Sequence, residues 1–431
     1  MKPLTEMMKE LEDLLAVCMR CGMCQAVCPL FEQTGKEADV ARGKLALLDG
    51  LMKEMFKNPK GVFERLNRCL LCGSCADNCP SNVNVLEIFM KARAILTGYM
   101  GLSPSERILL RGMLSHPATF DRITAWGTKF QKIFTRPVND LIGTSCARFT
   151  SPLLSKRHFL PLAPESFHHE TPRMNSVIGR ANIKVLFYVG CLIDKIFPHV
   201  ARAGINILHH HGVGVFIPEN MGCCGIPAIS SGDMKTFNQL VRHNISRFTK
   251  NRFDYLITAC ATCTATIKTV WPYMVRESDQ NEKDIIQEVA ILSEKVMDIN
   301  QFLVEKVGIE TSGKKMGSND FTVTYHDPCH LKKSLGVAEA PRQLIDANGD
   351  YRLKEMTASD WCCGLGGSFN LQYYEISAKI GEQKRKHIVD TGCSTVATGC
   401  PACMIQIADM LSRHQDAISI KHPIEIYAES L

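Results

Sequence analysis

The sequence contains no apolar run that approaches the roughly 20 residues needed to span a bilayer. Its first 15 residues, MKPLTEMMKELEDLL, also have neither the basic start nor the apolar stretch of a secretory signal peptide. Hydrophobic residues make up 45% of the 431 positions and charged residues 22%, which is typical of a soluble globular protein. We therefore expect a cytoplasmic protein of roughly two to four domains.

Motifs for nucleotide cofactors are missing as well. The sequence has no GxGxxG fingerprint of a dinucleotide-binding fold and no P-loop. No nucleophile with a matching base stands out as a catalytic pair. We therefore expect the chain to bind neither nicotinamide nor flavin itself, and to need a partner for chemistry on an organic substrate.

Cysteine, in contrast, is abundant, with 20 residues in the chain. The cytosol keeps thiols reduced, so disulfides are a poor explanation for this number. Two strings, GCCGIP (222–227) and WCCGLGG (361–367), each place two cysteines side by side. Adjacent cysteines rarely bridge each other, because the geometry of a disulfide strains the peptide between them. Metal ligation is the interpretation that fits these thiols.

Eight cysteines near the N-terminus form two copies of the run C-x2-C-x2-C-x3-C-P. This is the spacing of two-cluster ferredoxins, in which three thiolates of one run and the last thiolate of the other hold a [4Fe–4S] cube. Zinc is the alternative, since CxxC pairs also suit a tetrahedral zinc ion, but two intact copies favour iron and sulfide. The two cubane clusters are expected close enough for direct electron transfer. The first is predicted on Cys18, Cys21, Cys24 and Cys79, and the second on Cys69, Cys72, Cys75 and Cys28.

Ten further cysteines form two longer motifs, C-x31-CC-x35-C-x2-C and C-x32-CC-x36-C-x2-C. Corresponding cysteines lie 138, 139 and 140 residues apart at three landmarks, which indicates an internal duplication. The first copy contains Cys191, Cys223, Cys224, Cys260 and Cys263, and the second contains Cys329, Cys362, Cys363, Cys400 and Cys403.

Apolar runs in both copies predict strands that end just before a cysteine. This is the edge at which α/β sheets place their sites, and helix N-termini there could stabilise an anionic cluster. Gly225 and Gly364 would let the backbone turn sharply beside the cysteines. The predicted strands are 183–190, 213–218 and 254–259 in the first copy, and 321–327 and 394–399 in the second.

These patterns predict an α-helical ferredoxin domain followed by two duplicated α/β domains with short parallel sheets. The expected boundaries are 1–100 for the ferredoxin-like domain, 101–180 for a connector, and 181–310 and 320–431 for the two α/β domains. The connector contains 11 Lys and Arg against 5 Asp and Glu. It is interpreted either as a solvated face or as an interfacial helix near a membrane that passes electrons to quinone.

The order of two ferredoxin motifs followed by two CC motifs resembles the iron–sulfur subunits of glycolate oxidase and lactate dehydrogenase over nearly the whole chain. The strings TYHDPCHL (324–331) and CCGLGGSFN (362–370) resemble those subunits in particular. Heterodisulfide reductases share the cysteine-rich "CCG" domain and the same layout. The resemblance implies that each complete CCG motif carries a further iron–sulfur cluster. Five cysteines would support a non-cubane [4Fe–4S] form, and a cubane with one spare thiol is the alternative.

The resemblance also implies a function, which is electron transfer within a complex that oxidises glycolate, lactate or another 2-hydroxy acid. A separate FAD subunit would take two electrons from the acid, and the clusters would relay them to a quinone or another carrier. A quinone acceptor would suit a peripheral position on the inner face of the membrane. The alternative is a subunit like that of heterodisulfide reductase, which cleaves a disulfide at a non-cubane cluster. An iron–sulfur scaffold or sensor is a third, non-redox interpretation.

Charge adds little to these expectations. The formal net charge of +6 counts every thiol as neutral, whereas four thiolate-bound clusters would each carry about −2 or more. The loaded protein would then be near neutral or acidic, so binding to nucleic acid is not expected.

A few remaining residues carry no motif of their own. Cys146 and Cys393 match neither pattern and are expected to be ordinary thiols. The run 209–211 consists of three histidines, which we expect at a solvated helix C-terminus. His326 and Asp327 precede Cys329, where they would either shape the surroundings of a cluster or form a turn with the following proline.

Overall fold

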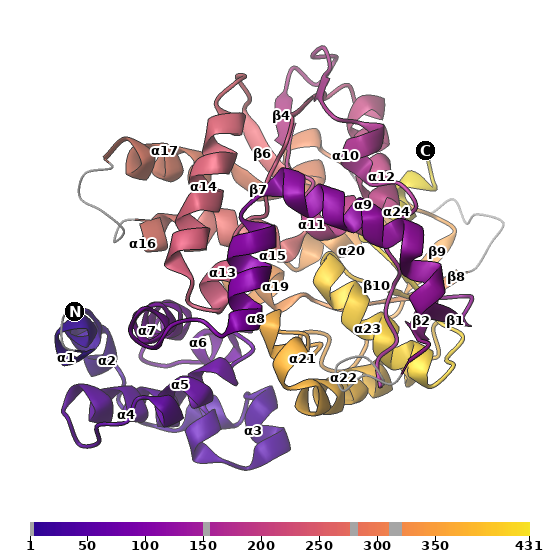
Figure 1. Cartoon of the computed structure of the whole chain (residues 1–431). Helices are drawn as coiled ribbons and strands as arrows, with labels where there is room; N and C mark the ends of the chain where they lie inside the picture. The colour runs from indigo at the N-terminus through magenta and orange to yellow at the C-terminus, as the bar shows by residue number, and fades with distance from the viewer. Residues whose placement is uncertain (1–3, 150–155, 276–282, 310–320) are drawn as a thin grey trace.

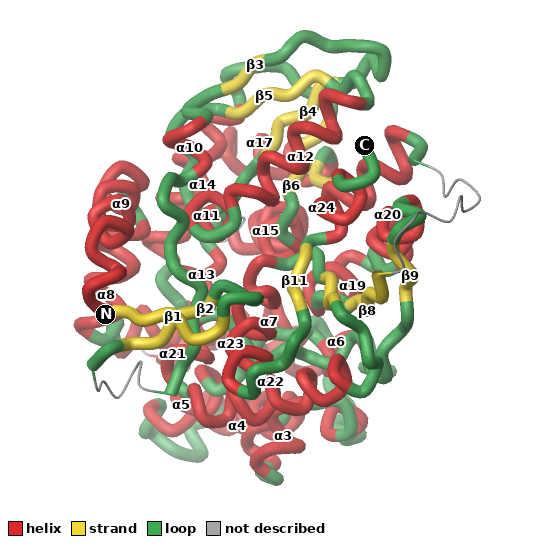
Figure 2. The backbone as a smooth tube through the Cα atoms, turned by 90° about the vertical axis from the view of Figure 1, so that its right-hand side faces the viewer, coloured by secondary structure: helices red, strands yellow, loops and turns green. Residues whose placement is uncertain are grey.

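The computed structural model describes residues 4–149, 156–275, 283–309 and 321–431. The N-terminal helices lie at the bottom of the molecule, beneath two parts that each contain a sheet (Figure 1). The same arrangement is visible from the side, where the strands of the two sheets lie above the helices α3, α4 and α5 (Figure 2). No helix within the described residues combines the length and the apolar character needed to cross a membrane.

Residues 4–100 form helices and loops only, as predicted for a ferredoxin-like domain. The proline that ends the first cysteine run has a structural role, because Pro29 occupies the first turn of α3, where the fixed φ of proline suits a helix. The helices are α1 (Leu4–Met8), α2 (Glu12–Ala16), α3 (Pro29–Thr34), α4 (Ala41–Met52), α5 (Lys60–Asn67), α6 (Ser74–Asp77) and α7 (Val85–Met100).

The first α/β part contains a sheet in the order β3-β5-β4-β6-β7. The strands β5, β4, β6 and β7 are parallel, and β3 is antiparallel at one edge. Their apolar residues are buried on both faces, which explains the continuous hydrophobic runs in the sequence. The strands are β3 (Met174–Asn175), β4 (Lys184–Phe187), β5 (Gly214–Ile217), β6 (Tyr255–Thr258) and β7 (Val296–Asp298).

Helices cover this sheet and follow its strands in alternation. Helix α11 begins at Cys191, and Cys260 is the N-cap of α15, so two of the motif cysteines lie at helix starts as expected. The helices are α11 (Cys191–Lys195), α12 (Pro198–His210), α13 (Ile226–Ser230), α14 (Met234–Phe248), α15 (Ala261–Ala265), α16 (Trp271–Val275), α17 (Lys283–Glu294) and α18 (Ile299–Phe302).

The second α/β part has a fully parallel sheet in the order β11-β10-β8-β9. If the parallel strands of each copy are numbered along the chain, both sheets have the spatial order second, first, third, fourth (β5-β4-β6-β7 and β9-β8-β10-β11). This shared order supports the duplication inferred from the cysteine spacing. The elements are β8 (Phe321–Tyr325), α19 (Cys329–Leu335), α20 (Glu339–Ala347), β9 (Tyr351–Leu353), α21 (Ser368–Gln372), α22 (Tyr374–Val389), β10 (Thr395–Ala397), α23 (Pro401–Arg413), β11 (Ser419–Lys421) and α24 (Pro423–Ala428).

Three parallel strands go beyond those predicted from the sequence. The strands β9 and β11 lack an apolar run, because only one residue of Tyr351–Leu353 and none of Ser419–Lys421 is fully buried. The third, β7, has only three residues. The five predicted strands are all present, each slightly shorter than the apolar run that indicated it.

The segment between the ferredoxin-like helices and the first sheet is more structured than a simple linker. It provides the edge strand β3 and packs against both α/β parts, and Thr144 forms a buried hydroxyl contact with Ser412 of α23. Its long helix α9 lies across the outer surface of the molecule (Figure 1). The remaining elements are α8 (Pro104–Arg107), α9 (Pro117–Phe134), β1 (Thr135–Asn139), β2 (Thr144–Ala147) and α10 (Phe167–Glu170).

Candidate iron–sulfur sites

The second ferredoxin-type site is a cavity lined by four thiols from both cysteine runs. Cys28 of the first run meets Cys69, Cys72 and Cys75 of the second, as the predicted exchange of the fourth ligand requires. Burial is the main cause that raises the pKa of Cys28 to about 12, and the neighbouring thiols of Cys72 and Cys69 contribute to this shift. Four thiols around one cavity, of which Cys72 is buried and the others are half-buried, would have to lose their protons together when they bind a cluster.

The first ferredoxin-type site is more exposed and lies between α2 and α3. Burial is the main cause that raises the pKa of Cys24, and the neighbouring thiol of Cys18 adds to it. Cys21 is exposed, and both Cys21 and Cys24 lie near the guanidinium group of Arg42. The fourth predicted ligand, Cys79, follows helix α6, which contacts the turn Met23–Gln25 of the first run. The structure thus packs the two runs against each other.

The backbone of both runs has the same unusual shape. Arg20 and Leu71, each between the first two cysteines of its run, adopt positive φ angles of 59° and 54°. Gly22 and Gly73, directly after the second cysteine, have φ angles of 89° and 77°. A non-glycine residue in this region is strained and persists where the surroundings require it. When left-handed and right-handed backbone conformations alternate, successive amide N–H groups can point to one side of the loop, where they bind an anion.

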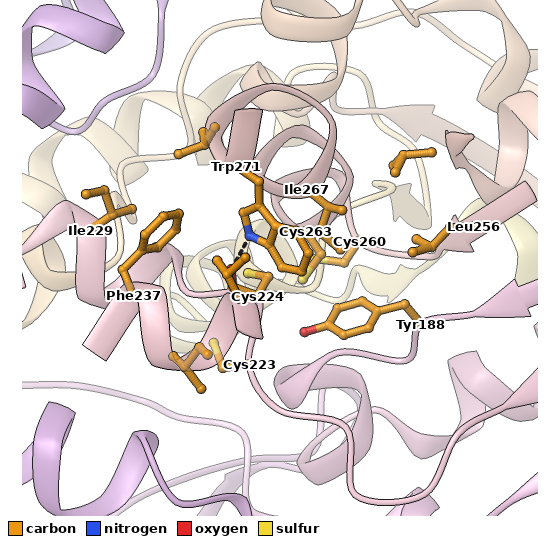
Figure 3. Close-up of a cluster of buried hydrophobic side chains, with 14 of the residues drawn as sticks. Tyr188, Cys223, Cys224, Ile229, Phe237, Leu256, Cys260, Cys263, Ile267 and Trp271 are labelled. Atoms are coloured by element: carbon orange, nitrogen blue, oxygen red, sulfur yellow. Dashed lines mark hydrogen bonds between the residues drawn. The ribbon is translucent and has the colours of Figure 1, made fainter. Parts of the chain in front are cut away.

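Four cysteines of the first long motif, Cys223, Cys224, Cys260 and Cys263, lie near one another (Figure 3), and Cys260 is the N-cap of α15. The Sγ atoms of Cys191 and Cys223 are 4.0 Å apart, and the other cysteines of the motif are buried. Neighbouring side chains hold the CC loop by its carbonyl groups. Trp271 Nε1 donates to the carbonyl oxygen of Cys224 at 2.8 Å, and Asn244 Nδ2 to that of Cys223 at 2.9 Å.

The second long motif forms an equivalent group of thiols. The Sγ atoms of Cys363 and Cys403 are 3.3 Å apart, and contact with Cys362 is the main cause that raises the pKa of Cys329. The ammonium group of Lys384 lies in the same region, where Nζ donates to the carbonyl oxygens of Ala358 and Ser359 at 2.7 and 3.2 Å. Burial lowers the pKa of Lys384 to about 8, and the thiols of Cys363 and Cys362 oppose this shift.

Glycine follows the CC pair in both motifs, and the structure shows why. Gly225 and Gly364 both have a φ angle of 95°, a conformation that L side chains rarely adopt. A Cβ atom on Gly364 would lie 2.6 Å from the carbonyl oxygen of Ser377, and one on Gly225 would lie 2.8 Å from the ring of Phe237. The sharp turn beside the cysteines was predicted from the sequence, and it is confirmed.

Replacing Gly364 with alanine is therefore expected to destabilise the protein by about 1–3 kcal/mol or more, from backbone strain together with the clash. Gly61 provides the matched control, since it lies in α5 and a Cβ atom there would meet nothing within 4 Å. G61A is expected to be neutral or slightly stabilising. Urea unfolding of both variants under argon measures the difference, and equal midpoints would contradict the assigned role of Gly364.

The thiol sites of different domains are in contact with one another. The contact with Cys362 and burial raise the pKa of Cys72 well above its ordinary range, so the second ferredoxin-type site adjoins the second long motif. Cys362 and Cys72 also pack in one buried cluster. On the far side, Cys260 donates to Cys400 and lowers the pKa of that thiol, so the second long motif adjoins the first.

A side-chain network joins the same three sites. His330, directly after Cys329, lies between the carbonyl oxygen of Leu71 and the hydroxyl of Thr262, each at 3.2 Å from a ring nitrogen. The Thr262 hydroxyl is also 3.4 Å from Cys400 Sγ. Lys333 Nζ donates to Ser74 Oγ at 2.7 Å, and that oxygen is 3.5 Å from Cys72 Sγ.

The donor set and its surroundings fit iron–sulfur clusters. The ligand candidates are soft thiols, the donors that select such clusters, and backbone amides point at them. Leu71 N donates to Cys69 Sγ and Gly364 N to Cys362 Sγ, both at 3.4 Å. Burial lowers the pKa of the Arg93 guanidinium, and the charges of Cys69 and Tyr373 oppose this shift. An anionic group held by Cys69 would compensate the charge of the guanidinium.

Family models match this arrangement in all three parts of the chain. Residues 15–83 match a 4Fe-4S dicluster domain. Residues 185–268 and 323–408 each match a cysteine-rich domain named CCG. The chain therefore combines a 4Fe-4S dicluster domain with two CCG domains, in the order that its cysteine motifs had indicated.

Curated relatives cover more than half of the chain at low identity. A probable glycolate oxidase iron-sulfur subunit of Bacillus subtilis is 27% identical over 92% of this chain and 89% of its own length. One of the subunits of a fumarate reductase (CoM/CoB) from Methanothermobacter marburgensis is 27% identical over 92% of this chain and 68% of its own length. A lactate utilization protein of Geobacillus is 28% identical over 57% of this chain and 98% of its own length.

A solved structure supports the fold alone. A hypothetical protein from Helicobacter pylori aligns with the whole chain and with 77% of its own length, at a TM-score of 0.51 and 10% sequence identity. The whole arrangement of helical part and two α/β parts therefore has a known counterpart.

Most of the other residues singled out from the sequence make contacts that stabilise the fold. Arg136 Nε donates to Cys146 Sγ at 3.2 Å in the β1–β2 hairpin, and Cys393 is buried before β10. Of the histidine run, His211 is half-buried and lies 2.9 Å from the Tyr427 hydroxyl. Asp327 binds Arg342 through both oxygens at 2.8 and 2.9 Å, so it holds the turn. His326 lies beside two cysteines of the second motif.

Sequence reasoning missed several residues around these sites. Thr262 and His330 each lie within or next to a cysteine motif, a position that could have drawn attention to them. Lys384 and Arg93 lie in ordinary amphipathic helices, and only the fold places their charges beside the thiols.

Proposed function

We propose that this chain is the electron-transferring subunit of a complex that oxidises a 2-hydroxy acid such as glycolate or lactate. The observation that carries the proposal is the continuous row of thiol sites, from the two ferredoxin-type sites through the second CCG site to the first. The contacts between Cys72 and Cys362 and between Cys260 and Cys400 join the successive sites. The names of the relatives that act on glycolate and lactate support the choice of substrate.

Under this proposal all eighteen motif cysteines hold clusters, two cubanes in the ferredoxin-like part and one further cluster in each CCG domain. Each cluster, when bound, would supply a one-electron carrier. The chain's own residues hold the carriers close together, exclude water through the buried core, and place Arg93, Lys333 and Lys384 near the thiols. Cations and hydrogen bonds near sulfur raise the reduction potential of a cluster, so these residues set the potentials along the row.

Substrate chemistry would belong to an FAD-containing partner that passes electrons on one at a time. Affinity purification of the tagged chain from its native host tests this directly. A flavoprotein should co-purify, and adding glycolate or lactate should reduce the clusters of the complex. If a flavoprotein is absent, or if neither acid reduces the clusters, the proposal is wrong.

Metal content gives an independent check of the cofactors. The anaerobically purified protein should contain about 16 iron atoms per chain, because four [4Fe–4S] clusters are expected. A value of about 8 iron atoms would remove the CCG clusters from the proposal, and stoichiometric zinc would remove iron altogether. Whether the CCG clusters are cubane or non-cubane would follow from their EPR spectra.

A second candidate function is cleavage of a disulfide at the first CCG site. A shallow, solvent-facing depression reaches this site and is lined by Cys191 and Cys223 together with Phe120 of α9. A small thiol or disulfide could approach a cluster there. The test is catalytic turnover of a heterodisulfide. Under this alternative the reduced protein should cleave the disulfide repeatedly and faster than a control without protein, whereas a protein that only relays electrons should not.

Helix α9 is the surface that we propose for contact with a membrane, which would bring the relay to a quinone. The helix has no buried residue over its 18 positions. Trp126 and Ile133 are 66% and 63% exposed on one side of it, and Lys129 and Lys132 lie between them in sequence. An exposed apolar stripe with basic neighbours suits the interface of an anionic bilayer.

The double substitution W126S/I133S is expected to lower binding to vesicles that contain anionic lipid by more than tenfold, because it removes about 2–4 kcal/mol of apolar contact. Co-sedimentation with such vesicles, and with neutral ones, measures the effect. The substitution V177S is the control, since Val177 is 89% exposed but lies outside α9. If the wild-type protein binds neither kind of vesicle, the proposed contact of α9 with a membrane is wrong.

A further inference from the structure

The duplicated CCG domains differ at one position that faces the thiols. Tyr188 lies three residues before the first cysteine of the first motif, and His326 lies three residues before that of the second. The Tyr188 hydroxyl donates to the carbonyl oxygen of Gly222 at 2.7 Å. Its polar atom therefore serves to hold the loop that carries the CC pair, and the first site receives no nitrogen donor from this position.

His326 uses only one of its two ring nitrogens in a comparable way. Its Nδ1 lies 3.0 Å from the carbonyl oxygen of Ser359, in the loop that leads to the second CC pair. A carbonyl oxygen can only accept, so Nδ1 carries the proton. In a neutral imidazole the other nitrogen, Nε2, then has a free lone pair.

That second nitrogen is buried without a protein partner. The side chain is 1% exposed, and Nε2 has no hydrogen-bond partner among the described residues. A ring nitrogen of His326 lies within 4.8 Å of both Cys363 Sγ and Cys403 Sγ. A buried histidine beside two thiols that donates one N–H to a backbone carbonyl and keeps its other nitrogen without a partner has the arrangement typical of a metal ligand.

We propose that His326 binds an iron of the second CCG cluster through Nε2, so that the two duplicated sites hold chemically different clusters. The second site then offers five sulfur donors and one nitrogen donor, and the first offers sulfur alone. The bond forms by donation of the nitrogen lone pair to iron and releases no proton, because Nε2 carries none. This assignment concerns the metal centre itself and holds whether the protein relays electrons or cleaves a disulfide.

A neutral nitrogen ligand would also order the potentials along the row. Where the imidazole takes the place of one of the five thiolates at iron, it reduces the negative charge there, and histidine ligation in place of cysteine raises the potential of iron–sulfur centres. The second CCG site would then have a higher potential than the first, although the two sequences descend from one motif. The site that touches the ferredoxin-like part would be the one that retains electrons longest.

Pulsed EPR of protein labelled with ¹⁵N-histidine tests the proposal without relying on activity. In the wild-type protein with all clusters loaded, a nitrogen coupling should appear on a CCG cluster and should change with the isotope. In H326A the coupling should be lost, the midpoint potential of that cluster should fall, and the other clusters should keep their spectra. Adding imidazole to H326A should restore a nitrogen coupling.

Two matched variants assign the signal. H330Q removes the neighbouring histidine and should leave the coupling unchanged, and Y188F alters the equivalent position of the first copy and should also leave it unchanged. The proposal is wrong if the loaded wild-type protein shows no isotope-sensitive coupling, if the coupling survives in H326A, or if zinc occupies the second site. Because the isotope effect is measured on the wild-type protein, the test remains valid even if H326A fails to fold.

Discussion

Replacing both Cys362 and Cys363 with serine is expected to reduce electron transfer through the protein to the background rate. The second CCG site is the junction of the row, because Cys362 contacts Cys72 of the ferredoxin-like part and Cys400 contacts Cys260 of the first CCG domain. Without a cluster at the junction, the first CCG site would be separated from the ferredoxin pair. Iron content should fall from about 16 to about 12 atoms per chain, as expected for the loss of one cluster.

The measurement is turnover of the complex with a 2-hydroxy acid and an artificial acceptor, together with EPR of the remaining clusters. C393S is the matched control, since Cys393 is a buried thiol of the same domain outside the motif; it should keep its iron and its rate, with a stability change of only about 1 kcal/mol. If the double variant loses four iron atoms but keeps its rate, electrons bypass the second CCG site.

The cysteine spacing predicted which thiols lie together in the fold, because most members of each group belong to one motif. The same holds for Gly225 and Gly364, where the turn beside the CC pair needs a φ angle that few other residues adopt. The parallel strands were also predictable, since a strand buried on both faces needs a continuous apolar run. The strands β9 and β11 escaped prediction because their residues are only partly buried.

The order of the sites in space could not be predicted, because it depends on how the domains pack. In the sequence the first CCG domain follows the ferredoxin-like part, yet the thiol of Cys72 contacts the second CCG domain. The first CCG domain meets the ferredoxin-like part through other residues, since the Thr97 hydroxyl of α7 donates to the carbonyl oxygen of Ser231 at 3.0 Å. Motif spacing carries no information about such contacts.

The same reason hid the charged groups around the thiols. Lys384 is one of several lysines and arginines in α22, and its sequence neighbours are exposed or half-buried. Only the packed structure shows that its side chain is enclosed and directed toward the second CCG site. Groups of this kind set cluster potentials, so the chemistry of the ligands is more predictable from sequence than their energetics.

Replacing Arg93 with methionine is expected to destabilise the folded protein by about 3–5 kcal/mol, the range for removing one partner from a buried charged network. Arg93 is 2% exposed in α7, and its guanidinium donates to three carbonyl oxygens. These belong to Leu66 at 2.5 Å, Cys69 at 2.8 Å and Ser230 at 2.6 Å. The methionine variant would leave all three without this donor, and it would weaken the contact between the ferredoxin-like part and the first CCG domain.

Unfolding by urea under argon measures the stability, and a redox titration followed by EPR measures the second ferredoxin-type cluster. R107M is the control, because Arg107 is exposed in α8 and its replacement should change stability by no more than about 0.5 kcal/mol. R93K separates the two roles of the side chain: it keeps the positive charge but cannot reach three carbonyls from one planar group. R93K should therefore lose much of the stability and retain most of the potential, whereas R93M should lower both. Equal potentials for R93M and the wild-type protein would mean that Arg93 only joins the domains and does not compensate a cluster's charge.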